Sequence, residues 1–177
     1  MPRQIALLRA VNLGPVNRVK MADLRVLLER EGYEDVRTLF QSGNVVLTSG
    51  KQPATVAREI ERLLADELGV ETDVIVRTRD ELAGAIERNP IAEADEQPKR
   101  CQVSFLAAEP DAAAVEWVAG IDVAPERFEV SGREVYAWHP DGLQRSKLAR
   151  ALGDGLGVTA TARNWNTVTK LLELADD

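Results

Sequence analysis

Short runs of consecutive hydrophobic residues alternate along the chain with stretches in which hydrophobic residues recur every three or four positions. A continuous run such as residues 5–8 is typical of a buried strand, whereas the spacing that begins at Met21 and ends near Gly32 is typical of a helix. In the first half the pattern predicts strands at residues 5–8, 36–40, 45–48 and 74–76, and helices that begin at Met21 and Pro53. The predicted order is therefore β-α-β-β-α-β.

The second half of the chain repeats this order. Strands are predicted at residues 103–106, 128–130, 135–138 and 159–162, helices at 112–118 and 143–156, and an added helix at 165–175. Both expected hairpins turn on a Ser-Gly pair, at residues 42–43 and 131–132, which supports an internal duplication. We therefore expect an α+β fold of two ferredoxin-like halves, residues 1–78 and 101–177, joined by a helix and linker at 79–100, with an added C-terminal helix.

The composition is that of an acidic globular protein. The 177 residues are 45% hydrophobic and carry a formal net charge of −7. Non-specific nucleic-acid binding is not expected, because it depends on basic residues that neutralise phosphates. No apolar run approaches the ~20 residues of a membrane-spanning helix, and residues 1–4 lack the character of a signal peptide. We expect a cytoplasmic protein that does not bind a membrane.

The residue inventory offers little for metal or covalent chemistry. Cys101 is the only cysteine and precedes an apolar strand, where a buried structural thiol is expected rather than a nucleophile. His139 is the only histidine and has no obvious carboxylate partner, so we expect a surface loop residue rather than a general base. We expect no metal site and no cofactor, and the sequence leaves open whether the protein is an enzyme.

Several short motifs resemble those of a bacterial protein family. They lie at residues 7–14, 19–21 and 41–46, and later at 89–90, 142, 146–147, 163–167 and 170. In content and order they resemble the family known as domain of unknown function 1697, over nearly the whole chain. The resemblance implies two ferredoxin-like parts and no particular activity. Ala10 and Pro15 depart from its pattern, which favours glycine at both positions, and this argues against a loop that wraps a phosphate.

A first group of polar residues lies in the long loop after the first strand and in the first hairpin. A βαββαβ sandwich places this loop and this hairpin at the same end of the sheet. A small anion bearing phosphate or carboxylate is the expected ligand, with Arg9 and Lys20 supplying positive charge. The candidate residues are Arg9, Asn12, Lys20, Gln41, Ser42 and Asn44. The alternative is that the amides close the hairpin and satisfy the loop.

A second group of polar residues lies near the C-terminus and consists of Ser146, Lys147, Arg163, Asn164, Trp165 and Lys170. Ser146 and Lys147 fall early in a helix, where an anion can be held, and Trp165 is able to stack on a planar ligand. The favoured interpretation is structural: Asn164 caps the last helix and Trp165 covers its first turn.

Three classes of function follow from these residues. The leading hypothesis is binding of a small anionic ligand, with any catalysis arising from positioning and electrostatic stabilisation. An RNA- or single-stranded-DNA-binding module is one alternative, because ferredoxin-like sheets can present aromatic side chains to bases. A protein-interaction or homodimerisation domain is the other, because an open sheet face or edge is a ready contact surface.

Overall fold

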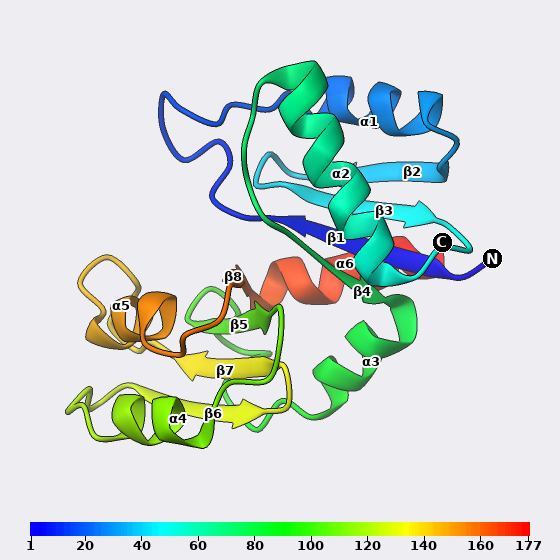
Figure 1. The fold of residues 1–177 in the computed structure, drawn as a ribbon. Coiled ribbons are helices and arrows are strands. Elements are labelled where there is room, and N and C mark those ends of the chain that lie inside the picture. The colour runs from blue at the N-terminus through cyan, green and yellow to red at the C-terminus, as the bar shows by residue number, and fades with distance from the viewer. The chain divides into compact units, whose positions relative to one another are not determined.

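A computed structural model describes residues 1–177. The chain forms two compact units: unit 1 comprises residues 1–84 and 170–177, and unit 2 comprises residues 85–169. Each unit contains the order β-α-β-β-α-β that the hydrophobic pattern predicts, which confirms the α+β fold (Figure 1). The C-terminal end of the chain belongs to unit 1, whereas the sequence alone assigned it to the second half.

Unit 1 is built on one four-stranded antiparallel sheet. Its strands are β1 (Arg3–Leu8), β2 (Glu34–Leu39), β3 (Asn44–Thr48) and β4 (Val74–Thr78), in the order β2-β3-β1-β4, and its helices are α1 (Met21–Arg30), α2 (Pro53–Leu68) and α3 (Arg79–Glu87), which continues into unit 2. The apolar stripes of α1 and α2 pack on one face of the sheet, where Leu24 and Ile60 are fully buried with Leu8. Helix α2 begins at Pro53 and ends where Gly69 adopts a φ of 64°, as its sequence predicts.

Unit 2 repeats this architecture with shorter helices. Its strands are β5 (Cys101–Leu106), β6 (Arg127–Ser131), β7 (Glu134–Trp138) and β8 (Ala160–Asn164), in the order β6-β7-β5-β8, and its helices are α4 (Ala112–Ala119), α5 (Lys147–Asp154) and the first part of α6 (Trp165–Asp176). Helix α5 starts later than residue 143 because Ser146 caps it, accepting a hydrogen bond from the Ala149 amide at 2.9 Å.

The two sheets share the same register. Gln4 in β1 pairs with Leu47 and Thr78, and Gln102 in β5 pairs in the same way with Ala137 and Asn164. Gln4 and Gln102 are therefore corresponding positions, and so are the residues that pair with them. This correspondence supports the internal duplication and allows each position of one sheet to be compared with its counterpart in the other.

The two central strands of each sheet, β1 and β3 in unit 1 and β5 and β7 in unit 2, are buried on both faces. On the face of the first sheet that lies away from α1 and α2, Ile5 and Val46 are fully buried. On the matching face of the second sheet, Tyr136 is fully buried and Trp138 is 7% exposed. The sheets therefore present no exposed aromatic platform on which bases can stack, and the RNA-binding alternative has no support in this geometry.

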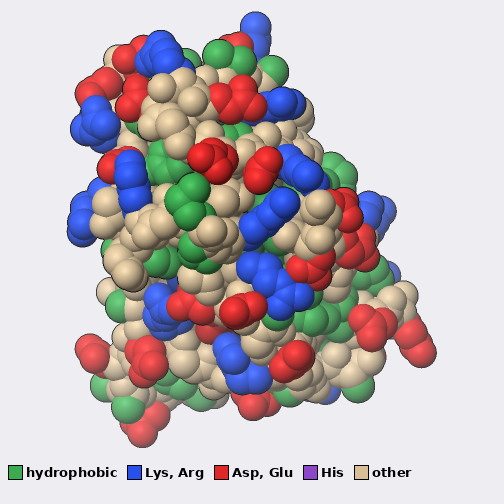
Figure 2. Space-filling model, turned by 90° about the vertical axis from the view of Figure 1, so that its right-hand side faces the viewer, with side chains coloured by type: hydrophobic (Ala, Val, Ile, Leu, Met, Phe, Trp, Pro, Cys, Tyr) green, Lys and Arg blue, Asp and Glu red, His purple; other side chains and the backbone are tan.

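The charged surface is mixed in sign. Lys and Arg side chains are interspersed with Asp and Glu side chains over the face shown in Figure 2, without a broad basic stripe on that face. Among the helices, none has both the length and the apolar character required to cross a bilayer.

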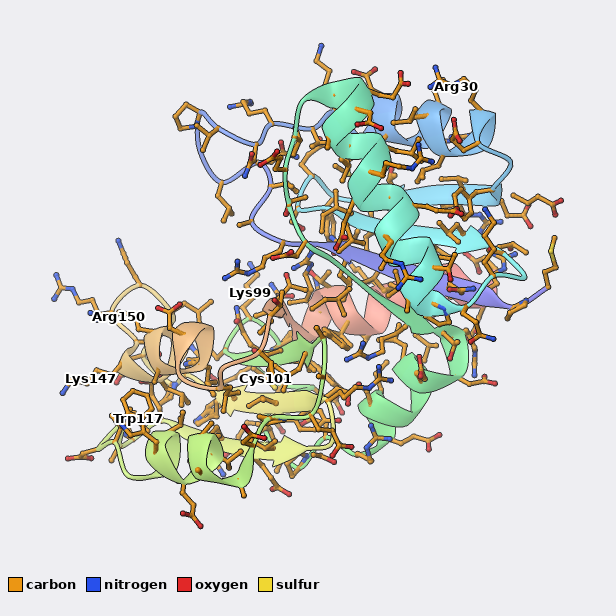
Figure 3. The ribbon with its side chains drawn as sticks, viewed as in Figure 1. Arg30, Lys99, Cys101, Trp117, Lys147 and Arg150 are labelled. Carbon is orange, nitrogen blue, oxygen red and sulfur yellow. The ribbon has the colours of Figure 1, made fainter.

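Cys101 begins β5, and its side chain is fully buried in unit 2 (Figure 3). Burial raises the pKa of its thiol to about 11, so about one thiol in a thousand is ionised at pH 8. We expect iodoacetamide to modify the native protein at least about a hundredfold more slowly than the protein unfolded in guanidinium. Rapid stoichiometric labelling of the native protein would contradict the assignment of a buried structural thiol.

Candidate functional site

The loop between β1 and α1 is fastened to the first hairpin by one side chain. The Nδ2 of Asn12 donates hydrogen bonds to the carbonyl oxygens of Val19 at 2.8 Å and Gln41 at 2.6 Å. Its Oδ1 accepts a third hydrogen bond from the Val19 amide at 2.8 Å. Because Gln41 belongs to the β2–β3 turn, these bonds confirm that the loop and the hairpin lie at the same end of the sheet.

The same loop holds several residues in the left-handed region of backbone conformation. Ala10, Asn12 and Asn17 have φ angles of 52°, 56° and 52°. For an alanine this conformation costs on the order of 1–2 kcal/mol. Strain of this kind persists only where the surrounding structure imposes it, and it is common at binding sites.

Beside this loop lies a hollow of about 410 Å³, lined by Asn12, Arg18, Val19, Lys20, Asp23, Gln41 and Leu68. Neither Arg18 nor Lys20 forms an ion pair or side-chain hydrogen bond within the protein. Helix α1 begins here without a side-chain cap, because its N-cap residue is Lys20. The positive end of the helix and two cationic side chains therefore border the same hollow, with Asp23 as its one carboxylate.

Three of the six residues of the first sequence-based group line this hollow: Asn12, Lys20 and Gln41. Arg9 does not line it, and its guanidinium lies 3.9 Å from the carboxylate of Asp73. The buried amide of Asn44 donates to Ser42 Oγ at 2.8 Å and to the carbonyl of Leu39 at 3.0 Å. Ser42 and Asn44 therefore close the hairpin, which is the role that the sequence left open for them.

Arg18 is the residue of this hollow that the sequence reasoning overlooked. It belongs to no motif and stands two positions before Lys20. Alternate residues of an extended segment project to the same side, and this spacing is the signal that could have identified it.

The second sequence-based group is dispersed over several structural contacts. Asn164 accepts a hydrogen bond from the Thr167 amide at 2.9 Å, and the Trp165 indole donates to Asp95 at 2.9 Å. Lys170 belongs to unit 1, where its Nζ lies 5.4 Å from the centroid of the Phe40 ring. These contacts leave Asn164 and Trp165 engaged at the start of α6.

Arg163 of the same group is buried in β8. Its Nη1 donates to Thr161 Oγ1 at 2.7 Å and to the carbonyl of Ala162 at 3.0 Å, and burial lowers the pKa of its guanidinium to about 10. Of the six residues, only Ser146 and Lys147 line a common hollow, one of about 290 Å³ at the start of α5. The Lys147 side chain projects outward from α5 (Figure 3). The structure therefore does not bring the six residues of this group around one site.

The expectation of a surface histidine without a carboxylate partner is wrong. His139 is 1% exposed, and its Nδ1 lies 2.5 Å from Oε2 of Glu126. The two residues meet because Arg127 pairs with Trp138 in the β6–β7 hairpin, which places Glu126 beside His139. Counting the hairpin register back from the turn at Gly132 could have identified this pair.

Ser146 completes a compact polar cluster with this pair. Its Oγ donates to Glu126 Oε2 at 2.5 Å and lies 3.2 Å from His139 Nδ1. Burial by itself would raise the pKa of the Glu126 carboxyl, but the hydrogen bonds from His139, Ser146 and the Leu148 amide together hold that pKa below its usual value.

The cluster does not have the geometry of a serine-hydrolase triad. In a triad the carboxylate and the serine contact different nitrogens of the imidazole. Here Glu126 and Ser146 both face Nδ1 of His139, so the nitrogen nearest the hydroxyl is already held by the carboxylate. The other ring nitrogen, Nε2, has no hydrogen-bond partner within the protein.

Comparisons with known proteins agree with the fold and assign no chemistry to it. Residues 1–136 match the family described as "Protein of unknown function (DUF1697)". The solved structure of the conserved bacterial protein SP0830 from Streptococcus pneumoniae is similar, with a TM-score of 0.77 and 22% identity over 98% of each chain. A comparison with curated proteins finds no match. The chain belongs to the DUF1697 family.

Proposed function

We propose that the protein binds a small anion, bearing phosphate or carboxylate, in the hollow beside the β1–α1 loop of unit 1. The observation that carries this proposal is the position of Arg18 and Lys20. Both cations border one hollow together with the Gln41 side of the hairpin, and neither has an ionic partner within the protein. An anion would supply the missing partner to both side chains at once.

The electrostatics of the hollow favour an anion over a cation or a neutral molecule. Two positive side chains face one carboxylate, that of Asp23, and the uncapped start of α1 adds its free amide groups. A guanidinium matches the planar, two-oxygen edge of a carboxylate or phosphate better than an ammonium does, so Arg18 is the principal contact. A volume of about 410 Å³ suits a small molecule.

The loop is held to the hairpin by hydrogen bonds within the protein. The Asn12 side chain bonds to the backbone of Val19, near the end of the loop, and to the backbone of Gln41 in the hairpin. Binding to such a loop does not require the entropy loss of ordering a flexible segment, so more of the contact energy is expressed as affinity.

The proposal is tested by removing the two charges. In Arg18→Gln/Lys20→Gln we expect binding of inorganic pyrophosphate or citrate, measured by calorimetry at constant ionic strength, to weaken by at least about tenfold, because one charge-assisted contact is worth about 1.4 kcal/mol or more. Arg58→Gln is the matched control, since Arg58 is an exposed cation of α2 without an ionic partner. That variant should bind as the parent does.

Two outcomes would contradict the site. Equal losses in the double variant and in Arg58→Gln would show that the anions respond to overall charge rather than to this hollow. No binding of either anion by the parent would instead favour the protein-interaction hypothesis, for which the loop tip offers Leu13 and Val16, 81% and 73% exposed.

A further inference from the structure

Unit 2 contains a second pocket, unrelated to the anion hollow, between its sheet and α5. Its volume is about 360 Å³. The floor consists of small side chains of β5, β7 and β8, including Ser104, Ala137 and Ala162, and α5 lines the opposite side with Ala149 and Leu152. No lysine, arginine, aspartate or glutamate lines this pocket.

The duplicated halves show where the space comes from. Through the shared register, Ala137, Ala160 and Ala162 of unit 2 correspond to Leu47, Val74 and Val76 of unit 1. In unit 1 these larger side chains fill the layer between sheet and helices and belong to its buried core. The pocket of unit 2 therefore lies where alanine replaces leucine or valine at three positions, one on β7 and two on β8, on either side of β5.

The polar groups of this pocket also differ from their counterparts. The Gln4 amide of unit 1 donates to the carbonyls of Ser49 at 3.1 Å and Lys51 at 2.8 Å. The corresponding side chain in unit 2, Gln102, lines the pocket and makes no hydrogen bond within the protein. The glutamine that is hydrogen-bonded in unit 1 is therefore available to a ligand at the corresponding position of unit 2.

His139 provides the most specific feature of the pocket. The residue is 99% buried, lines the pocket, and directs Nδ1 to Glu126 and Ser146, neither of which lines it. The ring therefore presents its other edge, with the unpartnered Nε2, to the pocket. In the tautomer that donates Nδ1–H to the Glu126 carboxylate, Nε2 is the hydrogen-bond acceptor of the ring.

We propose that this pocket binds a small neutral molecule, with an apolar ring or short chain as its body and one hydroxyl or amino group. That hydroxyl or amino group donates a hydrogen bond to Nε2 of His139. The Gln102 amide donates to a free lone pair of the same group, or accepts its remaining hydrogen. The body lies over the alanine floor against Leu152. Cavities of ~150 Å³ already hold a benzene ring, so the pocket accommodates one ring with its substituent.

The single histidine makes this proposal directly measurable. In protein labelled with nitrogen-15 histidine, the two ring-nitrogen resonances of the NMR spectrum both come from His139. Phenol should shift the Nε2 resonance upfield as the nitrogen accepts its hydroxyl proton, while Nδ1 stays near its original position. Toluene has the same shape without the hydroxyl, and it should leave Nε2 unchanged.

Filling the pocket provides the second arm of the test. Ala162→Val restores the side chain that unit 1 carries at Val76, leaves Gln102 and His139 unchanged, and should weaken phenol binding by at least about tenfold. Ala113→Val, on the exposed side of α4, is the control and should bind phenol normally. An Nε2 shift with toluene as large as that with phenol, no shift with phenol, or unchanged phenol binding in Ala162→Val would each overturn the proposal.

Discussion

Replacing Gly43 with alanine is expected to lower the free energy of unfolding by about 3 kcal/mol or more, which would be among the largest single-residue effects in unit 1. A Cβ at this position would lie 2.6 Å from Leu8 Cβ and 2.8 Å from Val11 Cγ2. Neither neighbour can move easily, because Leu8 is fully buried in β1 and Val11 is 1% exposed. The φ of 83° adds a conformational penalty for any residue with a side chain.

The comparison with Gly32→Ala separates the two causes. Gly32 has a φ of 91°, but a Cβ there would meet nothing within 4 Å. This variant carries the conformational penalty alone and should cost about 1 kcal/mol. Urea unfolding of both variants measures the difference. Equal losses of unfolding free energy in the two variants would show that the close approach of the hairpin to β1 adds nothing to the cost of Gly43→Ala.

The effect of Gly43 bears on the proposed anion site. The Gly43 carbonyl accepts a hydrogen bond from the Leu8 amide at 2.8 Å, so the hairpin tip rests directly on the end of β1. Gln41, which receives the Asn12 hydrogen bond, lies two residues before this contact. A glycine at the tip thus allows the hairpin and the loop to meet at the spacing that forms the hollow.

The order of elements was predictable because it depends on local patterns. Hydrophobic spacing and the punctuating residues Gly32, Pro53 and Gly69 act within a few positions, so the eight strands could be placed without knowledge of their partners. The start of α5 was misplaced because a capping serine, Ser146, decided the boundary inside a stretch that still has helical character.

The candidate sites were less predictable because they depend on strand register and on small side chains that leave space between the sheet and a helix. Glu126 and His139 are joined only by the pairing of Arg127 with Trp138. The second pocket arises from small residues such as Ala137 and Ala162, which carry no chemical signal of their own. Both features become visible when the two halves are aligned strand by strand, because unit 1 then supplies the expected residue at each position.

Replacing Glu126 with alanine is expected to lower the free energy of unfolding by about 3 kcal/mol. The change leaves Nδ1 of His139 and the hydroxyl of Ser146 without their shared acceptor, and His139 is too deeply buried to exchange it for water. Glu129→Ala is the matched control three residues further along the chain, in β6, because Glu129 is exposed, and it should change stability by less than about 0.5 kcal/mol.

The contribution of Glu126 should also depend on pH in one direction. Its pKa is lower in the folded protein than its ordinary value of 4.5, since the hydrogen bonds from its neighbours favour the carboxylate. The stabilisation is therefore fully present above that value and is lost as the pH falls through the folded pKa. Urea midpoints of the parent and of Glu126→Gln should differ most above the ordinary pKa of 4.5 and should converge as the pH falls through the lowered pKa of the folded protein. A difference that stays constant over this interval, or a Glu126→Ala loss no greater than that of Glu129→Ala, would show that the carboxylate is not the acceptor that holds the cluster together.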